Sequence, residues 1–125
     1  MFQRIRWMLT ENHVTTDGTP PYPDLNPLEV SGTRTRVLER CKEAFLAGGP
    51  NWNLLRNQGS NRKIRGIVTT PLFQFRDRFT VWLENTDQTN SWKIMARSRA
   101  EIGIADFGKN ARNIRTFYQN MKDLT

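Results

Sequence analysis

The chain has 125 residues and a mass of 14.6 kDa, which fits a single domain. Hydrophobic residues make up 37% of it, and no window approaches the roughly 18 consecutive apolar residues of a membrane helix, so an integral membrane span is excluded. A single cysteine and a single histidine exclude an internal disulfide and the usual zinc sites. We therefore expect no bound metal or cofactor and no enzymatic activity.

The chain is strongly basic. Its 19 Lys and Arg residues outnumber 12 Asp and Glu residues, which gives a formal net charge of +7 and a pI near 10.3. Arginine supplies most of this charge, and its planar guanidinium favours specific, paired hydrogen bonds. Such a surface suits an anionic partner, which can be an acidic protein face, lipid headgroups or nucleic acid.

Residues 1–32 are predicted to form an N-terminal segment and an extended, proline-rich arm. Four prolines stand within eight residues, from Pro20 to Pro27. Proline fixes its own φ and biases the preceding residue toward extended forms, so a helix is excluded here. We expect another protein chain to hold the arm. The arm residues expected to bind this partner are Phe2, Trp7, Pro20, Pro21, Tyr22 and Pro23.

Residues 33–125 are predicted to form one α+β domain that begins with a helix over about 33–47. Thr33 is a suitable N-cap, and Gly48-Gly49-Pro50 ends the pattern. The apolar stripe consists of Val37, Leu38, Cys41, Ala44 and Phe45. Since Cys41 lies in this stripe, we interpret it as a small buried core residue rather than a nucleophile.

Four strand-like stretches follow, at about 52–57, 62–70, 76–84 and 91–99. The last two alternate apolar and polar residues, which is typical of an antiparallel sheet covered on one face. A second helix is predicted over about 106–122, with Asp106 as its N-cap. Its predicted inner face consists of Ile114, Phe117, Tyr118 and Met121, and its outer face of Lys109, Arg112, Arg115 and Gln119. The predicted architecture is therefore α-β-β-β-β-α, a four-stranded antiparallel meander with both helices on one face.

The alternation of the last two strands predicts a register in which Val81 faces Ile94 and Asp77 faces Ser98 on the covered side. Asp77 then places a carboxylate at the end of an apolar face, which is costly unless it is hydrogen-bonded or paired. One interpretation is an active site. The favoured one is a structural carboxylate that accepts backbone donors from the loop containing Gly103 and Gly108.

The same register places Arg78 opposite Arg97 and Arg76 opposite Arg99 on the open face, where like charges destabilise each other. A basic face with aromatic residues is typical of single-stranded nucleic-acid binders, and it equally suits docking on an acidic subunit. One tryptophan is no stacking platform, so the nucleic-acid signal is weak. The predicted partner-binding residues of this face are Arg65, Arg76, Arg78, Trp82, Lys93, Arg97 and Arg99.

The stretch RSRAEIGIADFGKNARNIRTFYQNM, from Arg97, resembles the C-terminal signature of an uncharacterised bacterial and organellar family, domain of unknown function 1499. Upstream, FQFRDRFTVWL resembles the family's F-x-D-D strand. The resemblance covers about residues 34–124 and implies a fold, not an activity. The matching residues are Phe75, Asp77, Arg97, Ser98, Gly103, Asp106, Gly108 and Asn110. The residues interpreted as structural polar groups are Asp77, Ser98, Glu101, Asp106 and Asn110.

The chain departs from this signature at three places. The family's second aspartate is Arg78 here, its arginine before the glycine is Glu101, and its arginine after the asparagine is Asn113. If the family's aspartate and arginine form a pair, Arg78 and Glu101 form the same pair with the charges exchanged. Any chemistry that needs the original residues is lost here, which favours a structural role.

These observations predict a non-catalytic accessory subunit of a large organellar assembly, docked through the arm and the basic face. An energy-converting membrane complex is the favoured setting, with a mitochondrion ranked ahead of a chloroplast because the resemblance implies organellar members. The alternative is an RNA-contacting subunit of an organellar ribonucleoprotein. A third hypothesis is a small-ligand binder or enzyme with a pocket near Asp77 and Ser98.

Overall fold

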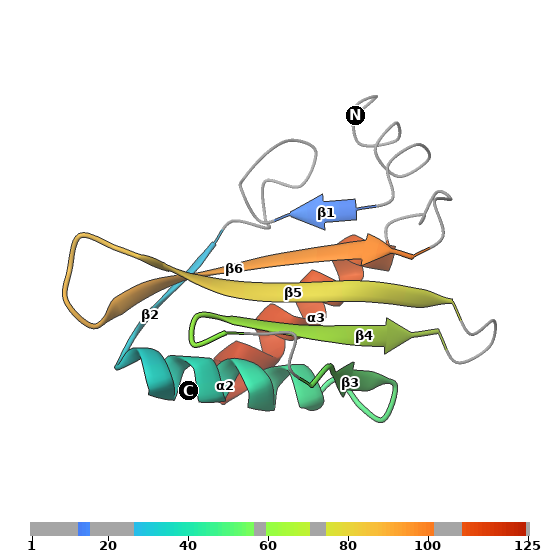
Figure 1. Cartoon of the computed structure of the whole chain (residues 1–125), viewed down its shortest axis with the longest axis horizontal. Helices are drawn as coiled ribbons and strands as arrows, with labels where there is room; N and C mark the ends of the chain where they lie inside the picture. Colours follow the sequence, from blue (N-terminus) through green and yellow to red (C-terminus); the bar gives the residue numbers. More distant parts are fainter. Residues whose placement is uncertain (1–12, 16–26, 57–59, 71–74, 102–108, 125) are drawn as a thin grey trace.

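The computed structural model describes residues 27–56, 60–70, 75–101 and 109–124, together with the backbone of residues 13–15. Figure 1 shows one twisted sheet with two helices packed against it. The elements in chain order are β1 (His13–Thr15), β2 (Leu28–Ser31), α2 (Arg34–Leu46), β3 (Trp52–Leu54), β4 (Lys63–Thr69), β5 (Arg76–Asn85), β6 (Ser91–Ala100) and α3 (Lys109–Asp123). The predicted α+β class is confirmed.

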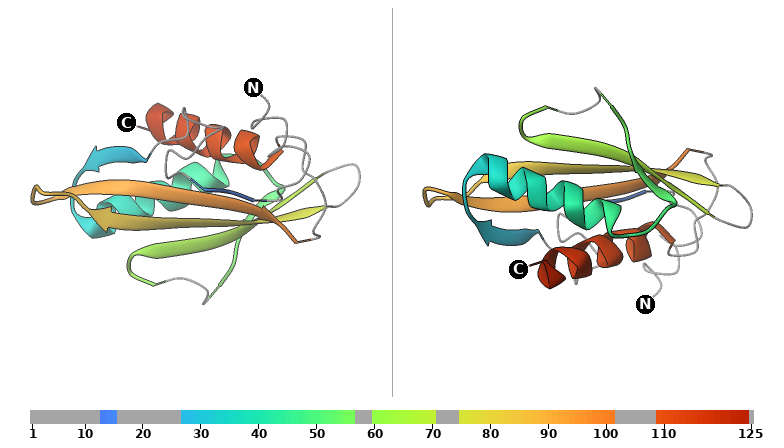
Figure 2. Two further views of the ribbon diagram at one scale, coloured as in Figure 1. Left: turned by 90° about the horizontal axis from the view of Figure 1, so that it is seen from above. Right: turned by 90° about the horizontal axis from the view of Figure 1, so that it is seen from below.

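The strands pair antiparallel in the order β1-β6-β5-β4-β3, and β2 also pairs with β6. Strands β3 to β6 are the predicted meander. Both helices lie on one face of the sheet, as the two views of Figure 2 show, and the opposite face is open. The helix-covered face holds most of the buried apolar residues, and neither described helix covers the opposite face, which we call the open face.

Two pieces of the predicted arm belong to this sheet. Strand β2 aligns Leu28 with Ile94 and Val30 with Trp92, and β1 aligns His13 with Arg99. Both strands pair with the edge of β6 that faces away from β5, and they occupy successive parts of it. Because an unpaired edge exposes a row of backbone donors and acceptors, this pairing satisfies groups of β6 that a four-stranded meander leaves open. The sheet thus begins inside the arm, earlier than residue 33.

Helix α2 forms as predicted. The Thr33 hydroxyl accepts a hydrogen bond from the Arg36 backbone N–H at 3.3 Å, which caps the first turn. Its five-residue apolar stripe is fully or almost fully buried, and Cys41 is 0% exposed. The predicted core role of Cys41 is confirmed, and burial raises the pKa of its thiol to about 12.

The register of β5 and β6 differs from the predicted one by two residues. Val81 faces Ala96 rather than Ile94, and Asp77 faces Ala100 rather than Ser98. The predicted register is wrong because the turn lies further along the chain, where the Thr86 hydroxyl donates to the Ser91 carbonyl at 3.1 Å. Since a shift of two residues preserves side-chain direction, every residue stays on its predicted face.

Helix α3 covers the other end of the sheet, beside β6. The residues on its inner side are buried, and the Tyr118 hydroxyl donates to the Ile94 carbonyl at 2.9 Å. The side-chain amide of Asn120 donates to the Ala44 carbonyl at 3.1 Å and so ties α3 to α2. The predicted N-cap, Asp106, lies outside the described residues. The buried apolar residues of the predicted inner face are Ile114, Phe117, Tyr118 and Met121.

Aromatic side chains join the helices to the sheet. The rings of Phe45, Trp52 and Phe79 contact one another, with centroids 5.0 to 5.6 Å apart. The ring of Phe79 also lies 5.4 Å from that of Phe117 of α3. Gly66 of β4 makes room for this cluster, because a Cβ atom there would stand 2.3 Å from Phe45 Cζ. The core therefore fixes the sheet closely against α2 and α3.

Candidate functional site

The open face of the sheet carries the arginines. Strand alternation directs Arg65 of β4, Arg76 and Arg78 of β5, and Arg97 and Arg99 of β6 away from the helices. All of these are exposed except Arg97, which is half-buried. The structure thus brings together on three adjacent strands the five arginines that were predicted to bind a partner; their role in binding stays a prediction.

The observed register arranges these arginines in two rows across the strands. In the first row, Arg65 faces Thr80 and Thr80 faces Arg97. In the next, Arg78 faces Arg99 directly. The predicted pairs of Arg78 with Arg97 and of Arg76 with Arg99 are wrong for the reason given above. Like charges that face each other across neighbouring strands disfavour each other unless an anion compensates them.

Lys93 and Trp82 stand apart from this cluster. Lys93 faces Glu84 on one side and Glu29 on the other, so its register neighbours are acidic. The indole N–H of Trp82 donates to Glu84 Oε2 at 3.1 Å, and its register neighbours include Met95. These two residues share the open face with the arginines but belong to a mixed-charge end of it.

Glu101 is the acid that does reach the arginine cluster. The Arg78 Nε–H donates to Glu101 Oε2 at 3.1 Å, and Arg76 Nε lies 3.4 Å from Oε1 of the same carboxylate. The contact expected between Arg78 and Glu101 is therefore present. It is largely exposed on the arginine side, so we expect it to add little to stability.

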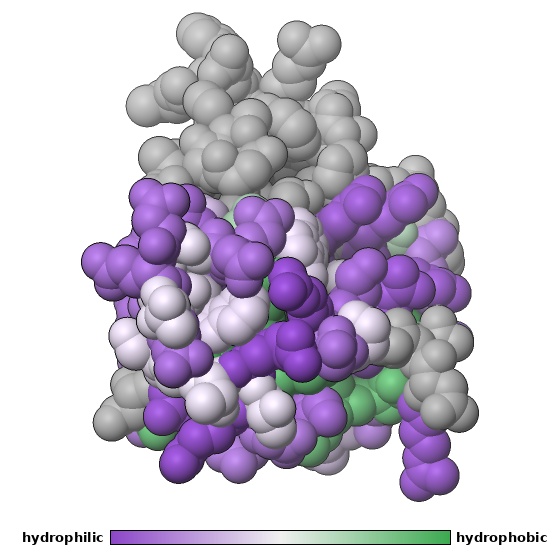
Figure 3. All heavy atoms as spheres, turned by 60° about the vertical axis from the view of Figure 1, so that its left-hand side comes forward, coloured by the Kyte–Doolittle hydropathy of each residue, from purple (hydrophilic) through white to green (hydrophobic). Residues whose placement is uncertain are grey.

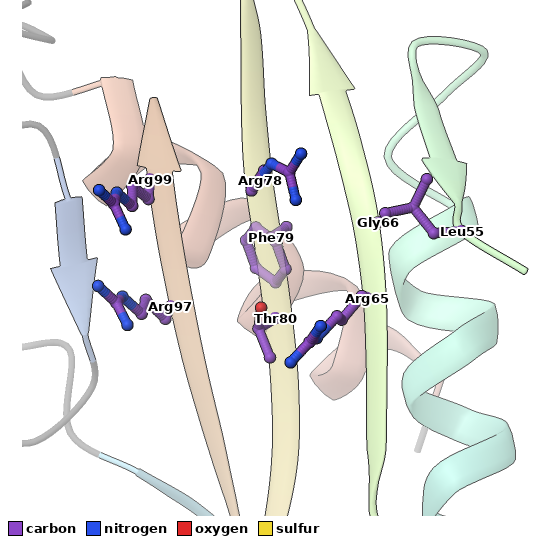
Figure 4. A pocket seen from close by; sticks show the side chains of 8 residues that line it. All are labelled: Leu55, Arg65, Gly66, Arg78, Phe79, Thr80, Arg97 and Arg99. Atoms are coloured by element: carbon purple, nitrogen blue, oxygen red, sulfur yellow. The ribbon is translucent and has the colours of Figure 1, made fainter. Parts of the chain in front are cut away.

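A hollow of about 140 Å³ opens among the arginines. In Figure 4, Arg97 and Arg99 extend from β6 toward β1, while Arg65 and Arg78 lie on the side of β4, with Thr80 between the two pairs. The hollow is lined by Leu55, Arg65, Gly66, Arg78, Phe79, Thr80, Arg97 and Arg99. It is a concave site lined by four arginines and a threonine.

A second, larger hollow of about 480 Å³ adjoins the first. Leu55 and Arg65 line both, so the two form a continuous basic surface across β4 toward α2. The second hollow is lined by Lys42, Leu54, Leu55, Arg56, Ser60, Lys63, Ile64 and Arg65. Its position fits an extended anionic partner better than a single small group.

Asp77 lies on the opposite face, in a buried polar network. It is 2% exposed, and its Oδ2 accepts hydrogen bonds from Lys109 Nζ at 2.5 Å and from Asn113 Nδ2 at 2.9 Å. Asn113 also donates to Ser98 Oγ at 3.1 Å, and Ser98 donates to Asn110 Oδ1 at 2.6 Å. The carboxylate is thus engaged by side chains of α3, which favours a structural role.

Sequence reasoning missed Lys109 and Asn113 as partners of Asp77. It expected backbone donors from a loop, and that loop lies outside the described residues. It also placed Lys109 on the outer face of the helix. The usable signal was the spacing, because Asn113 lies four residues after Lys109 and three after Asn110 and so lies on the same side of the helix as both.

The remaining predicted site residues lie outside the described part of the chain. These are Phe2, Trp7, Pro20, Pro21, Tyr22, Pro23 and Asp106. Among the described residues, no group of three or more His, Cys, Asp and Glu side chains is placed to hold a metal ion.

Hydrophilic residues cover most of the described surface on the side seen in Figure 3. Within the described ranges, neither helix combines the length and the apolar character that crossing a membrane requires.

The chain forms a small α+β domain whose antiparallel sheet has a basic open face. Asp77, Ser98 and Asn110 belong to a polar network buried on the other face. The chain belongs to the protein family of unknown function DUF1499, which it matches over residues 7–121. The match begins well before residue 34, so the family pattern includes the segment that contributes β1 and β2. A comparison with curated proteins gave no match.

Proposed function

We propose that this protein is a non-catalytic accessory subunit of a larger assembly and that it docks on an acidic neighbouring subunit through its open sheet face. The observation that carries the proposal is the cluster of Arg65, Arg78, Arg97 and Arg99 around a hollow that neither helix covers. Like charges on adjacent strands destabilise an isolated domain. Carboxylates of a neighbour would offset that cost and fix the orientation of the complex.

The second hollow supports an extended contact. Lys42, Arg56 and Lys63 continue the basic surface beyond Arg65, and apolar side chains lie between the charges. Interfaces commonly combine such apolar patches with charged rims. The organellar setting, with an energy-converting membrane complex favoured, rests on the resemblance and is part of the proposal.

An RNA-contacting role is the second candidate, favoured by the pI of 10.3. Sequence-tolerant RNA binding on a sheet relies on exposed aromatic rings that stack with bases. On the described open face the aromatic side chain is Trp82, which is half-buried and bonded to Glu84. The protein partner is therefore preferred.

The test is recovery of the tagged protein from its native source, followed by native electrophoresis with and without nuclease. We expect migration at high mass that survives nuclease. The variant Arg65→Gln/Arg97→Gln/Arg99→Gln should migrate as the free chain. A matched control, Arg36→Gln/Arg40→Gln/Arg112→Gln, removes the same charge from the helices and should keep the high mass.

Each other outcome contradicts the proposal. A mass that collapses with nuclease supports the ribonucleoprotein role instead. Wild-type protein that migrates as a free monomer overturns both roles. Equal loss of the complex in the two triple variants would mean that net charge, and not the open face, determines the assembly.

A further inference from the structure

The four-arginine hollow has the features of a binding site for a compact anion. Its walls come from three rigid strands, so the guanidinium groups are held on defined backbone positions rather than on loops (Figure 4). Thr80 lies between the two arginine pairs and supplies a hydroxyl. Guanidinium groups present planar, paired donors that match the oxygens of phosphoryl and carboxylate groups.

The positive charge around this hollow is not balanced by the described part of the chain. Glu101 pairs with Arg78 and with Arg76 at the rim. For Arg65, Arg97 and Arg99, no carboxylate oxygen among the described residues lies within 4 Å. Three arginines thus line one small space without a counter-charge from residues 27–56, 60–70, 75–101 and 109–124, which suits a bound anion.

Arg97 gives a second, independent indication that this hollow binds an anion. Its Nε is buried, and no hydrogen-bond acceptor in the described residues reaches it. A buried N–H without a partner is costly, so an acceptor from outside the described residues would stabilise it. Arg97 lines the hollow, and a small turn of its side chain would bring the Nε–H to an acceptor oxygen there.

We propose that this hollow binds a phosphate monoester group of a small phosphorylated molecule. A monoester carries a charge between about −1.5 and −2 and three acceptor oxygens at neutral pH. It can therefore accept from arginines on both sides of Thr80 at once. A carboxylate offers one charge and two oxygens along a single edge, and a phosphate diester offers one charge. The docking role uses the same arginines, so the phosphate group and an acidic neighbour would compete for them, but binding of the phosphate to the free chain does not require the docking role.

The experiment is a titration of the full-length protein with phenyl phosphate at pH 8 and low ionic strength, followed by calorimetry. Parallel titrations use inorganic phosphate, dimethyl phosphate and acetate. We expect saturable binding of phenyl phosphate and inorganic phosphate with one site per chain. Dimethyl phosphate and acetate should bind at least about tenfold more weakly, because each lacks the second charge.

Arg97→Lys is the decisive variant, since it keeps the charge and removes the Nε donor. It should weaken phenyl phosphate binding by about tenfold, as expected for the loss of a hydrogen bond between charged groups. Arg36→Lys, an exposed change on α2, is the matched control and should leave affinity unchanged. Circular dichroism and urea unfolding establish that both variants fold.

The alternatives give different patterns. Equal affinity for dimethyl phosphate overturns the monoester assignment and indicates a diester backbone, as in nucleic acid. Equal affinity for acetate overturns it in favour of a carboxylate. Wild-type affinity in a folded Arg97→Lys variant, or no saturable binding, overturns the site itself. Since no partner subunit is present, none of these results depends on the docking role.

Discussion

Lys109 Nζ lies 2.5 Å from Asp77 Oδ2, and this pair joins the first turn of α3 to the start of β5. The same oxygen accepts from Asn113, one helical turn later. The cation that meets the buried carboxylate comes from the first turn of the helix, one turn before Asn113. The pairing keeps a charged group in an otherwise apolar layer.

Substitution of Lys109 should lower the free energy of unfolding more than neutralisation of Asp77 does. Lys109→Met leaves the Asp77 carboxylate, which is 2% exposed, with Asn113 as its remaining described partner, and we expect a loss of about 3 kcal/mol in the free energy of unfolding. Asp77→Asn leaves a lysine whose side chain is 22% exposed and can reach water. We therefore expect a smaller loss in the free energy of unfolding, about 1–2 kcal/mol. Urea unfolding at pH 7 measures both.

The double variant Asp77→Asn/Lys109→Met should recover part of the loss, because it removes both charges together. Arg112→Met is the control, since Arg112 is an exposed cation on the same helix. Losses that simply add in the double variant would show that the two side chains act independently and would contradict the pairing.

Gly66 should tolerate no side chain. Gly66→Ala places a Cβ atom 2.3 Å from Phe45 Cζ and 2.9 Å from the Asn53 carbonyl oxygen, and backbone cannot move aside as easily as a side chain. We expect a loss of about 1–3 kcal/mol by urea unfolding. Thr69→Ala in the same strand is the control. A neutral Gly66→Ala would mean that α2 and β4 are not as close as described.

The strand pattern predicted most of the fold because alternation alone decides which face each residue occupies. It could not fix the register of β5 and β6, since a shift of two residues preserves that alternation and the turn chemistry at Thr86 decides between the choices. Strands β1 and β2 were also missed. They are short, and their pairing depends on the free edge of β6, which is a tertiary feature.

The sequence predicted which residues lie on the open face, but it did not predict how they are arranged there. Alternation placed the arginines on the open face, whereas the register determined that Thr80 stands between Arg65 and Arg97. The hollow and the buried Nε of Arg97 follow from side-chain packing across three strands, which no spacing within one strand reveals. Lys93 was grouped with the arginines because its acidic neighbours lie on other strands.

Cys41 should be unreactive in the folded protein. Burial raises the pKa of its thiol to about 12, so almost no thiolate is present at pH 8. We expect negligible labelling by a thiol reagent in buffer and complete labelling in urea. Rapid labelling of the native state would contradict the core position of this side chain.

Because the pKa of the Cys41 thiol is higher in the folded than in the unfolded chain, the free energy of unfolding falls as the pH rises above about 9. The unfolded thiol ionises near its ordinary pKa of 9.0, whereas the folded thiol ionises near 12. The stabilisation is therefore complete below pH 9 and is lost as pH rises to about 12, at up to about 1.4 kcal/mol per pH unit. Cys41→Ala lacks this component, so its free energy of unfolding should fall less steeply over that range.

Glu101 should weaken anion binding at the arginine hollow, because its carboxylate competes for Arg78 and Arg76. Glu101→Gln should raise the affinity for phenyl phosphate about twofold to fivefold, in line with the strength of an exposed ion pair, and should change stability by less than about 1 kcal/mol. Glu84→Gln is the matched control, since it removes the same charge from the open face but at the end near Trp82. Equal gains in the two variants would indicate a general effect of net charge and would contradict local competition by Glu101.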